Sequence, residues 1–183
     1  MRYSIFKMLF VLVIVCVVED VSGQLSVYTQ TIKNIDGGQV ALSSYQGSKV
    51  LFIIAPVDIE DSLKVSEIAA FNNRYGDTVK LIGIVSNEDG YVDSNKTKIK
   101  AMYQSKGVNI VLTEAMFTKK SAGANQSALM QWLTKQSMNK RFDENAKGVG
   151  QKFFADENGK LFSVLIPETD LFSPAVERNV YRK

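Results

Sequence analysis

Five polar side chains stand where two expected strands end: Asp58, Glu60, Asp61, Asn87 and Glu88. The first three follow the apolar run 50–54, and the last two follow the apolar run 79–85. Because the carboxyl ends of parallel strands meet at one edge of an open sheet, we expect these side chains to converge. Carboxylates gathered there could bind a hard cation or a basic ligand, or act as an acid/base pair. These five residues are our candidate ligand site.

A structural interpretation of the same acids has more support. Asp58 or Asp61 would cap the helix that follows, and acids near the start of that helix would favour its dipole. The remaining carboxylates would then be solvated surface. No spacing here matches a known calcium loop, so we expect no metal site.

The chain excludes several kinds of catalysis by what it lacks. Cys16 is the only cysteine among 183 residues, and there is no histidine. Without Cys16, the chain can form no thiolate nucleophile, histidine base or Cys/His zinc site. We therefore expect neither a metal nor another cofactor.

The N-terminus has the pattern of an export signal. A basic start precedes the apolar run 8–18, which is too short for a comfortable membrane span. A small residue at Gly23 suits cleavage, so we expect a signal peptide over 1–23 and a mature domain over 24–183. The mature chain would be periplasmic or secreted, with no membrane span. An uncleaved anchor is the alternative, with less support because acidic Glu19 and Asp20 follow the run at once.

Length and composition indicate one globular domain. Hydrophobic residues make up 45% of the chain and charged residues 22%. This composition supports a sizeable core and differs from that of disordered chains. The net charge of +3 is small, and no basic stripe is present, so we expect no nucleic-acid partner.

The central elements form a βαβ unit. The β-branched run 50–54 predicts a strand buried on both faces, and 79–85 predicts a second strand parallel to it. Between them, Leu63, Ile68 and Phe71 mark the apolar face of an amphipathic helix that ends near Gly76. Such a unit closes with right-handed connections.

Weaker patterns place the other elements around this unit. They predict strands 27–33 and 39–42 with a turn at 36–38, a helix around 99–106, a strand at 108–112, a helix at 127–135, a hairpin of 151–155 and 160–166, and a final helix from Ser173. The stretch 138–150 has little pattern and is expected to be polar and flexible. The fold class is α/β, with a central mixed sheet flanked by helices and an N-terminal β-hairpin.

This order resembles the thioredoxin-like fold, and its details resemble the glutathione peroxidases. The family's Ser-x-Tyr-x-Gly-Lys-Val-Leu segment is similar to Leu42-Ser-Ser-Tyr-Gln-Gly-Ser-Lys-Val-Leu51. Its Lys-Phe-Leu-Val-Asp-x-x-Gly-Lys is similar to Lys152-Phe-Phe-Ala-Asp-Glu-Asn-Gly-Lys160. The pieces lie in the same order over most of 25–180.

The family's catalytic tetrad does not carry over. Its peroxidatic cysteine or selenocysteine falls opposite 58–60, and its glutamine falls on Glu88. Its tryptophan and asparagine fall on or near Gly148 and Val149. Peroxide reduction needs an oxidisable thiolate or selenolate, and a carboxylate cannot replace it.

These departures lead to three functional hypotheses. The first is a non-catalytic binding or scaffold protein, whose partner is a protein, a peptide or a small ligand of unknown identity. The second is residual peroxidase or oxidoreductase activity in response to oxidative stress. The third is a carboxylate-based enzyme using Asp58 and Glu88. We favour the first because site chemistry, and not fold, determines function.

Overall fold

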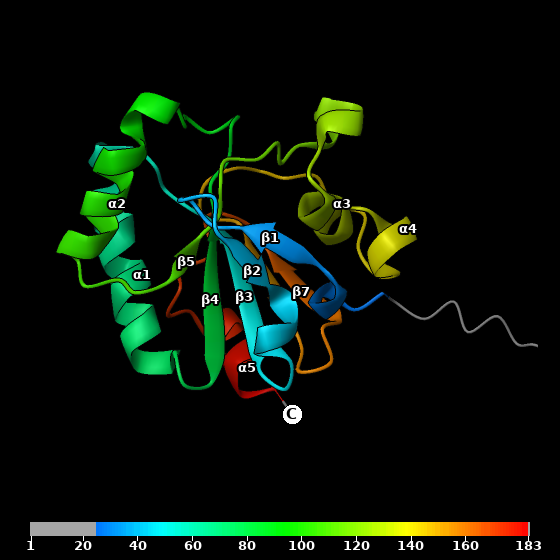
Figure 1. Ribbon diagram of the computed structural model, residues 1–183. Helices are drawn as coiled ribbons and strands as arrows, with labels where there is room; N and C mark the ends of the chain where they lie inside the picture. The colour runs from blue at the N-terminus through cyan, green and yellow to red at the C-terminus, as the bar shows by residue number, and fades with distance from the viewer. Residues whose placement is uncertain (1–24, 183) are drawn as a thin grey trace, which may run out of the picture.

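The computed structural model describes residues 25–182, and a five-stranded mixed sheet forms its centre (Figure 1). The strands, in spatial order, are β5 (Val111–Leu112), β4 (Val79–Ile84), β3 (Lys49–Ile54), β6 (Lys152–Ala155) and β7 (Leu161–Leu165). β3, β4 and β5 are parallel, whereas β6 is antiparallel to both β3 and β7. This confirms the mixed α/β sheet. The expected signal peptide, with Cys16, lies outside the described residues.

A small hairpin and five α-helices surround the sheet. The hairpin pairs β1 (Thr31–Lys33) with β2 (Gln39–Ala41) in antiparallel register. The α-helices are α1 (Ser62–Tyr75), α2 (Lys96–Ser105), α3 (Ala128–Thr134), α4 (Gln136–Asn139) and α5 (Pro174–Tyr181). Short 3-10 helices are η1 (Val27–Thr29), η2 (Leu42–Tyr45), η3 (Ile59–Asp61), η4 (Asp93–Asn95) and η5 (Lys120–Asn125). Within 25–182, no helix combines the length and the apolar character needed to cross a bilayer.

Alternation along the central strand divides the core into two layers. Leu51 and Ile53 face the cluster that contains the buried sides of α1, α2 and α5. Val50, Phe52 and Ile54 face the cluster that contains α3 and the N-terminal segment. All six residues of β3 are buried, as expected for a strand covered on both faces. Figure 1 shows α1 and α2 on one side of the sheet and α3 and α4 on the other.

The predicted first strand begins later than expected. Val27–Thr29 is a 3-10 turn, with the Tyr28 N–H donating to the Ser26 hydroxyl, and strand pairing starts at Thr31. Val27 and Tyr28 are both buried although they are neighbours. In a half-exposed strand, one of these two side chains would point into solvent. The 3-10 turn instead allows both to pack in the core.

One apolar residue of the predicted α1 face was assigned wrongly. Leu63 is 76% exposed, whereas Val65, Ile68 and Phe71 are buried. Leu63 lies in the first turn of α1 and is not among the buried residues of that helix. The buried face instead follows the 3.6-residue period from Val65.

The predicted strand 108–112 is reduced to its last two residues. Next to these two residues, the β1–β2 hairpin bonds to the same edge of the sheet: the Ile35 N–H donates to Leu112 O at 2.7 Å, and the Glu114 N–H donates to Lys33 O at 2.8 Å.

The stretch 138–150 begins in α4 and is held by Asn139. The side chain of Asn139 donates to Trp132 O and accepts from the Phe142 N–H.

The C-terminal helix is attached to the central strand through a buried ammonium. Lys49 is 6% exposed, and its Nζ donates to Val180 O at 2.9 Å and to Arg182 O. These carbonyls lie at the C-terminal end of α5, where helical acceptors lack backbone partners and cations are favoured. The contact therefore joins the last helix to the first strand of the central sheet.

We expect Ser173→Ala to lower the free energy of unfolding by about 1 kcal/mol. Ser173 is the N-cap of α5, and its Oγ accepts from the Val176 N–H. Urea denaturation measures the change, with Ser137→Ala in α4 as a matched exposed control expected to stay within about 0.5 kcal/mol of the original chain. A Ser173 variant as stable as that control would show that the cap contributes nothing.

Candidate functional site

The candidate site lies at the carboxyl ends of β3 and β4, where the chain turns into α1 and into loop 86–90. After β3, Asp58 folds the chain into η3. Its Oδ1 accepts from the Glu60 N–H at 3.1 Å, and its carbonyl accepts from the Asp61 N–H at 3.1 Å. Asp58 and Glu60 are both exposed. The turn 58–61, here called the elbow, thus presents carboxylates to solvent and is held by hydrogen bonds within the turn itself.

Only part of the capping interpretation matches the structure. Asp61 occupies the N-cap position of α1, but its side chain accepts no helical N–H. It accepts from Lys64 Nζ at 2.7 Å instead. Asp58 bonds within η3, one turn before α1, so neither acid caps α1 through its side chain.

Glu88 holds two loops together. Its carboxylate accepts from the Thr118 N–H at 2.9 Å and from the Lys119 N–H at 3.0 Å. The hydroxyls of Ser86 and Thr118 each lie 3.2 Å from Oε2. Ser86 and Thr118 are buried, so this carboxylate supplies acceptors to donors that water does not reach.

The environment of Glu88 favours its charged form. Partial burial by itself raises the pKa, but the backbone N–H donors of Thr118 and Lys119 outweigh it and leave the pKa below its ordinary value. A carboxylate that stays ionised and is already bonded on both oxygens is a weak general acid.

The structure places Asp58 and Asn87 on different cavities. Asp58 lines a cavity of about 250 Å³ together with Val57, Gly90 and residues of α2. Asn87 lines a cavity of about 430 Å³ beside the β1–β2 turn, together with Asp36 and other residues. The candidate residues therefore share one end of the sheet, but Asp58 and Asn87 line separate cavities there.

Gly148, one of the expected tetrad positions, is crowded by a side chain from another loop. A Cβ built on Gly148 would lie 3.1 Å from Asp89 Oδ1, and Gly148 has a φ of +105°. The carboxylate of Asp89 thus takes the space that a side chain at 148 would need. Its Oδ2 is buried without a hydrogen-bond partner in the described chain. Val149 is half-buried beside Gly148.

Sequence reasoning missed Asp89 and Thr118 as members of this region. Asp89 could have been noticed because it directly follows Glu88 in the same loop. Thr118 carries no such signal, since it lies 30 residues from Glu88 in a segment without strong periodicity. Within 25–182, no three Asp, Glu, His or Cys side chains are grouped closely enough to hold a metal ion.

Comparison with solved structures establishes the fold. The structure of Trgpx in apo form is 18% identical, with 86% of this chain and 97% of that chain covered and a TM-score of 0.61. T. cruzi GPX1 is 12% identical, with 85% and 97% covered and a TM-score of 0.59. A thioredoxin-family thiol:disulfide interchange protein from Chlorobium tepidum TLS is 14% identical, with 82% and 92% covered and a TM-score of 0.55.

The chain therefore has a thioredoxin-like fold, similar to the folds of these three solved structures. At these identities, the likeness concerns the fold and not the activity. No family model and no curated protein matches the sequence.

Proposed function

We propose that this chain is an exported, non-catalytic binding or scaffold domain that presents the elbow face to a protein, a peptide or a small ligand. One observation carries the proposal: the elbow after β3 bears Asp58 and Glu60 and no thiol, and residues 25–182 contain no cysteine. Peroxide reduction by this fold needs an oxidisable sulfur or selenium at that place.

The surroundings of the elbow support the same proposal. The Glu88 carboxylate is bonded to two backbone N–H groups, so it is committed to holding loop 86–90 against Thr118. Asp89 fills the space beside Gly148, where the resembling family places an aromatic ring. The cavity of about 250 Å³ beside Asp58 remains as a place for a ligand group.

Peroxide consumption coupled to thioredoxin or glutathione tests the proposal. We expect the full chain and its Cys16→Ser variant to stay at the buffer background. Turnover that Cys16→Ser abolishes would show that the one thiol is used, and turnover that survives it would show sulfur-free redox chemistry. Either result would contradict a non-catalytic role.

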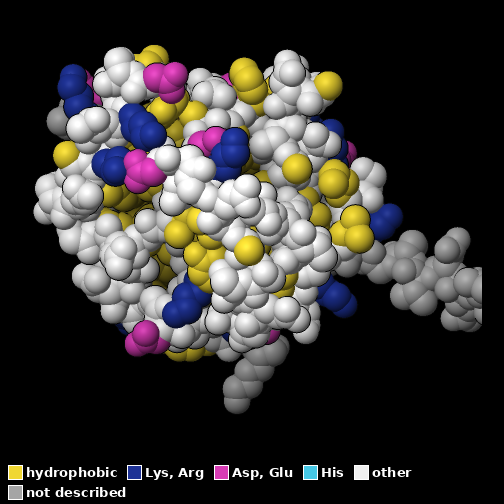
Figure 2. Space-filling model, viewed as in Figure 1, with side chains coloured by type: hydrophobic (Ala, Val, Ile, Leu, Met, Phe, Trp, Pro, Cys, Tyr) yellow, Lys and Arg dark blue, Asp and Glu magenta, His cyan; other side chains and the backbone are white. Residues whose placement is uncertain are grey.

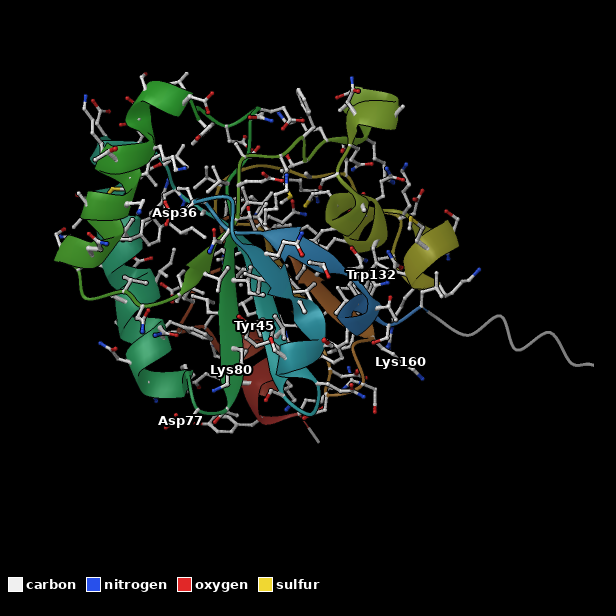
Figure 3. The ribbon with its side chains drawn as sticks, in the orientation of Figure 1. Asp36, Tyr45, Asp77, Lys80, Trp132 and Lys160 are labelled. Carbon is white, nitrogen blue, oxygen red and sulfur yellow. The ribbon has the colours of Figure 1, made fainter. Side chains whose placement is uncertain are left out.

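A binding readout tests the elbow face itself. We expect the double variant Asp58→Asn, Glu60→Gln to lose most of the affinity for a partner captured with the original chain. Lys160→Gln, at an exposed position in the β6–β7 turn far from the elbow (Figure 3), should bind that partner unchanged. Equal binding by all three chains would exclude the elbow as the binding face.

Carboxylate-based catalysis by Asp58 and Glu88 remains an untested alternative. It has less support because Glu88 is engaged in structural hydrogen bonds and its pKa is lowered. Asp58→Asn and Glu88→Gln would both have to abolish a measured hydrolytic or lyase activity for this alternative to hold.

A further inference from the structure

A second cleft lies at the opposite end of the sheet, where β4 begins. It has a volume of about 390 Å³ and lies between the C-terminal end of α1, the start of β4 and the segment that leads into β5. Its lining combines three asparagine amides, one tyrosine, an oppositely charged pair and three apolar residues. Figure 2 shows a hollow with hydrophobic side chains in it on this face, and Figure 3 shows Tyr45, Asp77 and Lys80 together at this end.

Polar side chains converge on this cleft without partners of their own. The amides of Asn72, Asn73 and Asn109 make no side-chain hydrogen bond within residues 25–182. The Tyr45 hydroxyl likewise has no partner in that part of the chain. Each amide offers both donors and an acceptor, and the hydroxyl offers one donor and acceptor sites. Groups of both kinds are therefore available to a ligand.

The charges of the lining cancel. Asp77 contributes one negative charge and Lys80 one positive charge, and no other lining residue is ionisable at neutral pH. Lys80 is already engaged, because its Nζ donates to Gly76 O at 2.8 Å. This lining has no cluster of cations for phosphate and no cluster of carboxylates for a metal or a basic ligand.

Three apolar residues line the cleft beside these polar groups. Leu81 is 5% exposed, and Ile110 and Val111 are half-buried beside it. A ligand that fits has an apolar face to lie on these residues and an edge of hydroxyls that both donate and accept hydrogen bonds. Ligand pockets range from roughly 300 to 1,000 Å³, so this cleft is at the small end of that range.

We propose that this cleft binds a neutral saccharide of one or two rings, with amides of Asn72, Asn73 and Asn109 bonding the ring hydroxyls. A sugar ring has C–H groups on its faces and hydroxyls at its edge, which matches an apolar floor with an amide rim. The site lies at the end of the sheet away from Asp58, so its test is independent of the proposed function.

Titration of the isotope-labelled full chain, followed by NMR, tests the proposal. The probes are glucose, N-acetylglucosamine, maltose and cellobiose, each added separately. We expect at least one to produce saturable shifts in the side-chain amide signals of Asn73 and Asn109 and in the backbone signals of 76–80. The signals of Asp58 and Gly90 should stay unchanged.

Matched asparagine variants make the result specific. Asn73 and Asn109 are exposed, so alanine at either position removes an amide without opening the core. We expect each to weaken binding of the responding sugar by about tenfold, whereas Asn125→Ala, at an exposed position in η5, leaves it unchanged. Wild-type affinity in both cleft variants would overturn the proposal.

Two charged small molecules test whether the cleft prefers a charged ligand instead. Inorganic phosphate and arginine are titrated in the same way, and neither is expected to shift the cleft signals. A saturable response to one of them without a response to any sugar would replace the neutral ligand by a charged one. No saturable shift with any of the four sugars would also overturn the proposal.

Discussion

Replacing Glu88 by alanine is expected to lower the free energy of unfolding by about 3 kcal/mol, which is large for a partly exposed carboxylate. The loss arises because the Thr118 N–H is buried and would have no acceptor, and because the Lys119 N–H loses its own. The hydroxyls of Ser86 and Thr118 would keep only each other, at 3.1 Å. Urea denaturation followed by circular dichroism measures it.

Two further variants separate hydrogen bonding from charge. Glu88→Gln keeps one acceptor oxygen but turns an NH₂ group toward a donor, so we expect a loss of about 1–2 kcal/mol. Glu114→Ala removes a carboxylate 3.7 Å from Lys33 Nζ, with both side chains about half exposed, and should cost at most about 0.5 kcal/mol. If Glu88→Ala is no worse than Glu114→Ala, the loop contacts do not stabilise the fold.

The same carboxylate makes stability depend on acid pH. Since the pKa of Glu88 is lower in the folded chain than its ordinary value of 4.5, its contribution is complete above that value and is lost as the pH falls through the folded pKa. The stability difference between the original chain and Glu88→Gln should therefore shrink in acid.

The second large effect is expected at alkaline pH and arises from Lys152. This lysine is 2% exposed, and its Nζ donates to Gly150 O at 2.6 Å and more weakly to Pro167 O. Desolvation lowers its pKa from 10.5 to about 8, although the carboxylates of Asp170, Glu67 and Glu168 act in the opposite direction. The folded chain thus releases this proton earlier than the unfolded chain does.

We therefore expect the free energy of unfolding to rise between about pH 8 and pH 9.5, by up to about 1.4 kcal/mol per pH unit. In that interval the unfolded state binds more protons than the folded state, which gives the slope a positive sign. Above pH 10, buried tyrosines such as Tyr103, whose pKa is raised by desolvation, reverse the slope. Denaturant titrations at several pH values measure the trend.

Lys152→Met is the control for the alkaline trend, because methionine has a similar length and does not titrate. Its stability should lack the rise between about pH 8 and pH 9.5, whatever its value at pH 7. A rise of equal size in the variant would assign the effect to other groups.

Local patterns predicted most elements of this fold. The β-branched runs of β3 and β4 predicted strands buried on both faces, and Ser173-Pro174 predicted the start of a helix, as the structure shows. Asn158-Gly159 predicted the turn between β6 and β7, where Gly159 has a φ of +75°. Each of these signals depends on neighbours in the sequence, which explains its reliability.

The errors concern residues whose state is set by distant contacts. The stretch 27–33 was predicted as an alternating strand, but the core accepts both of the neighbouring residues Val27 and Tyr28, and the Tyr28 hydroxyl donates to Asp156 O, 128 residues away. Leu63 looked like part of an apolar face, but it is not among the buried residues of α1. Periodicity alone cannot say which face of a first helical turn meets the sheet.

The candidate site was predictable as a place but not as an arrangement. Adjacent parallel strands fix the elbow and loop 86–90 at one end of the sheet, and both are found there. The partners of Glu88 in loop 117–119 and the proximity of Asp89 to Gly148 depend on loop conformations that have no period. The sequence therefore indicated which acids lie at this end of the sheet, whereas their division between cavities depends on the loop conformations.

The attachment of α5 to Lys49 has a consequence for how the chain matures. The ammonium on the first strand of the central sheet finds its carbonyl acceptors only in the last few residues, at Val180 and Arg182. A polypeptide made from its N-terminus onward can thus assemble β3, and can later place the Glu157 carboxylate 3.6 Å from this ammonium, but it lacks the two carbonyl acceptors until synthesis is nearly finished. Premature termination even one helical turn short would leave the buried ammonium with the Glu157 carboxylate but without its hydrogen-bond acceptors, and such fragments should be degraded rather than accumulate.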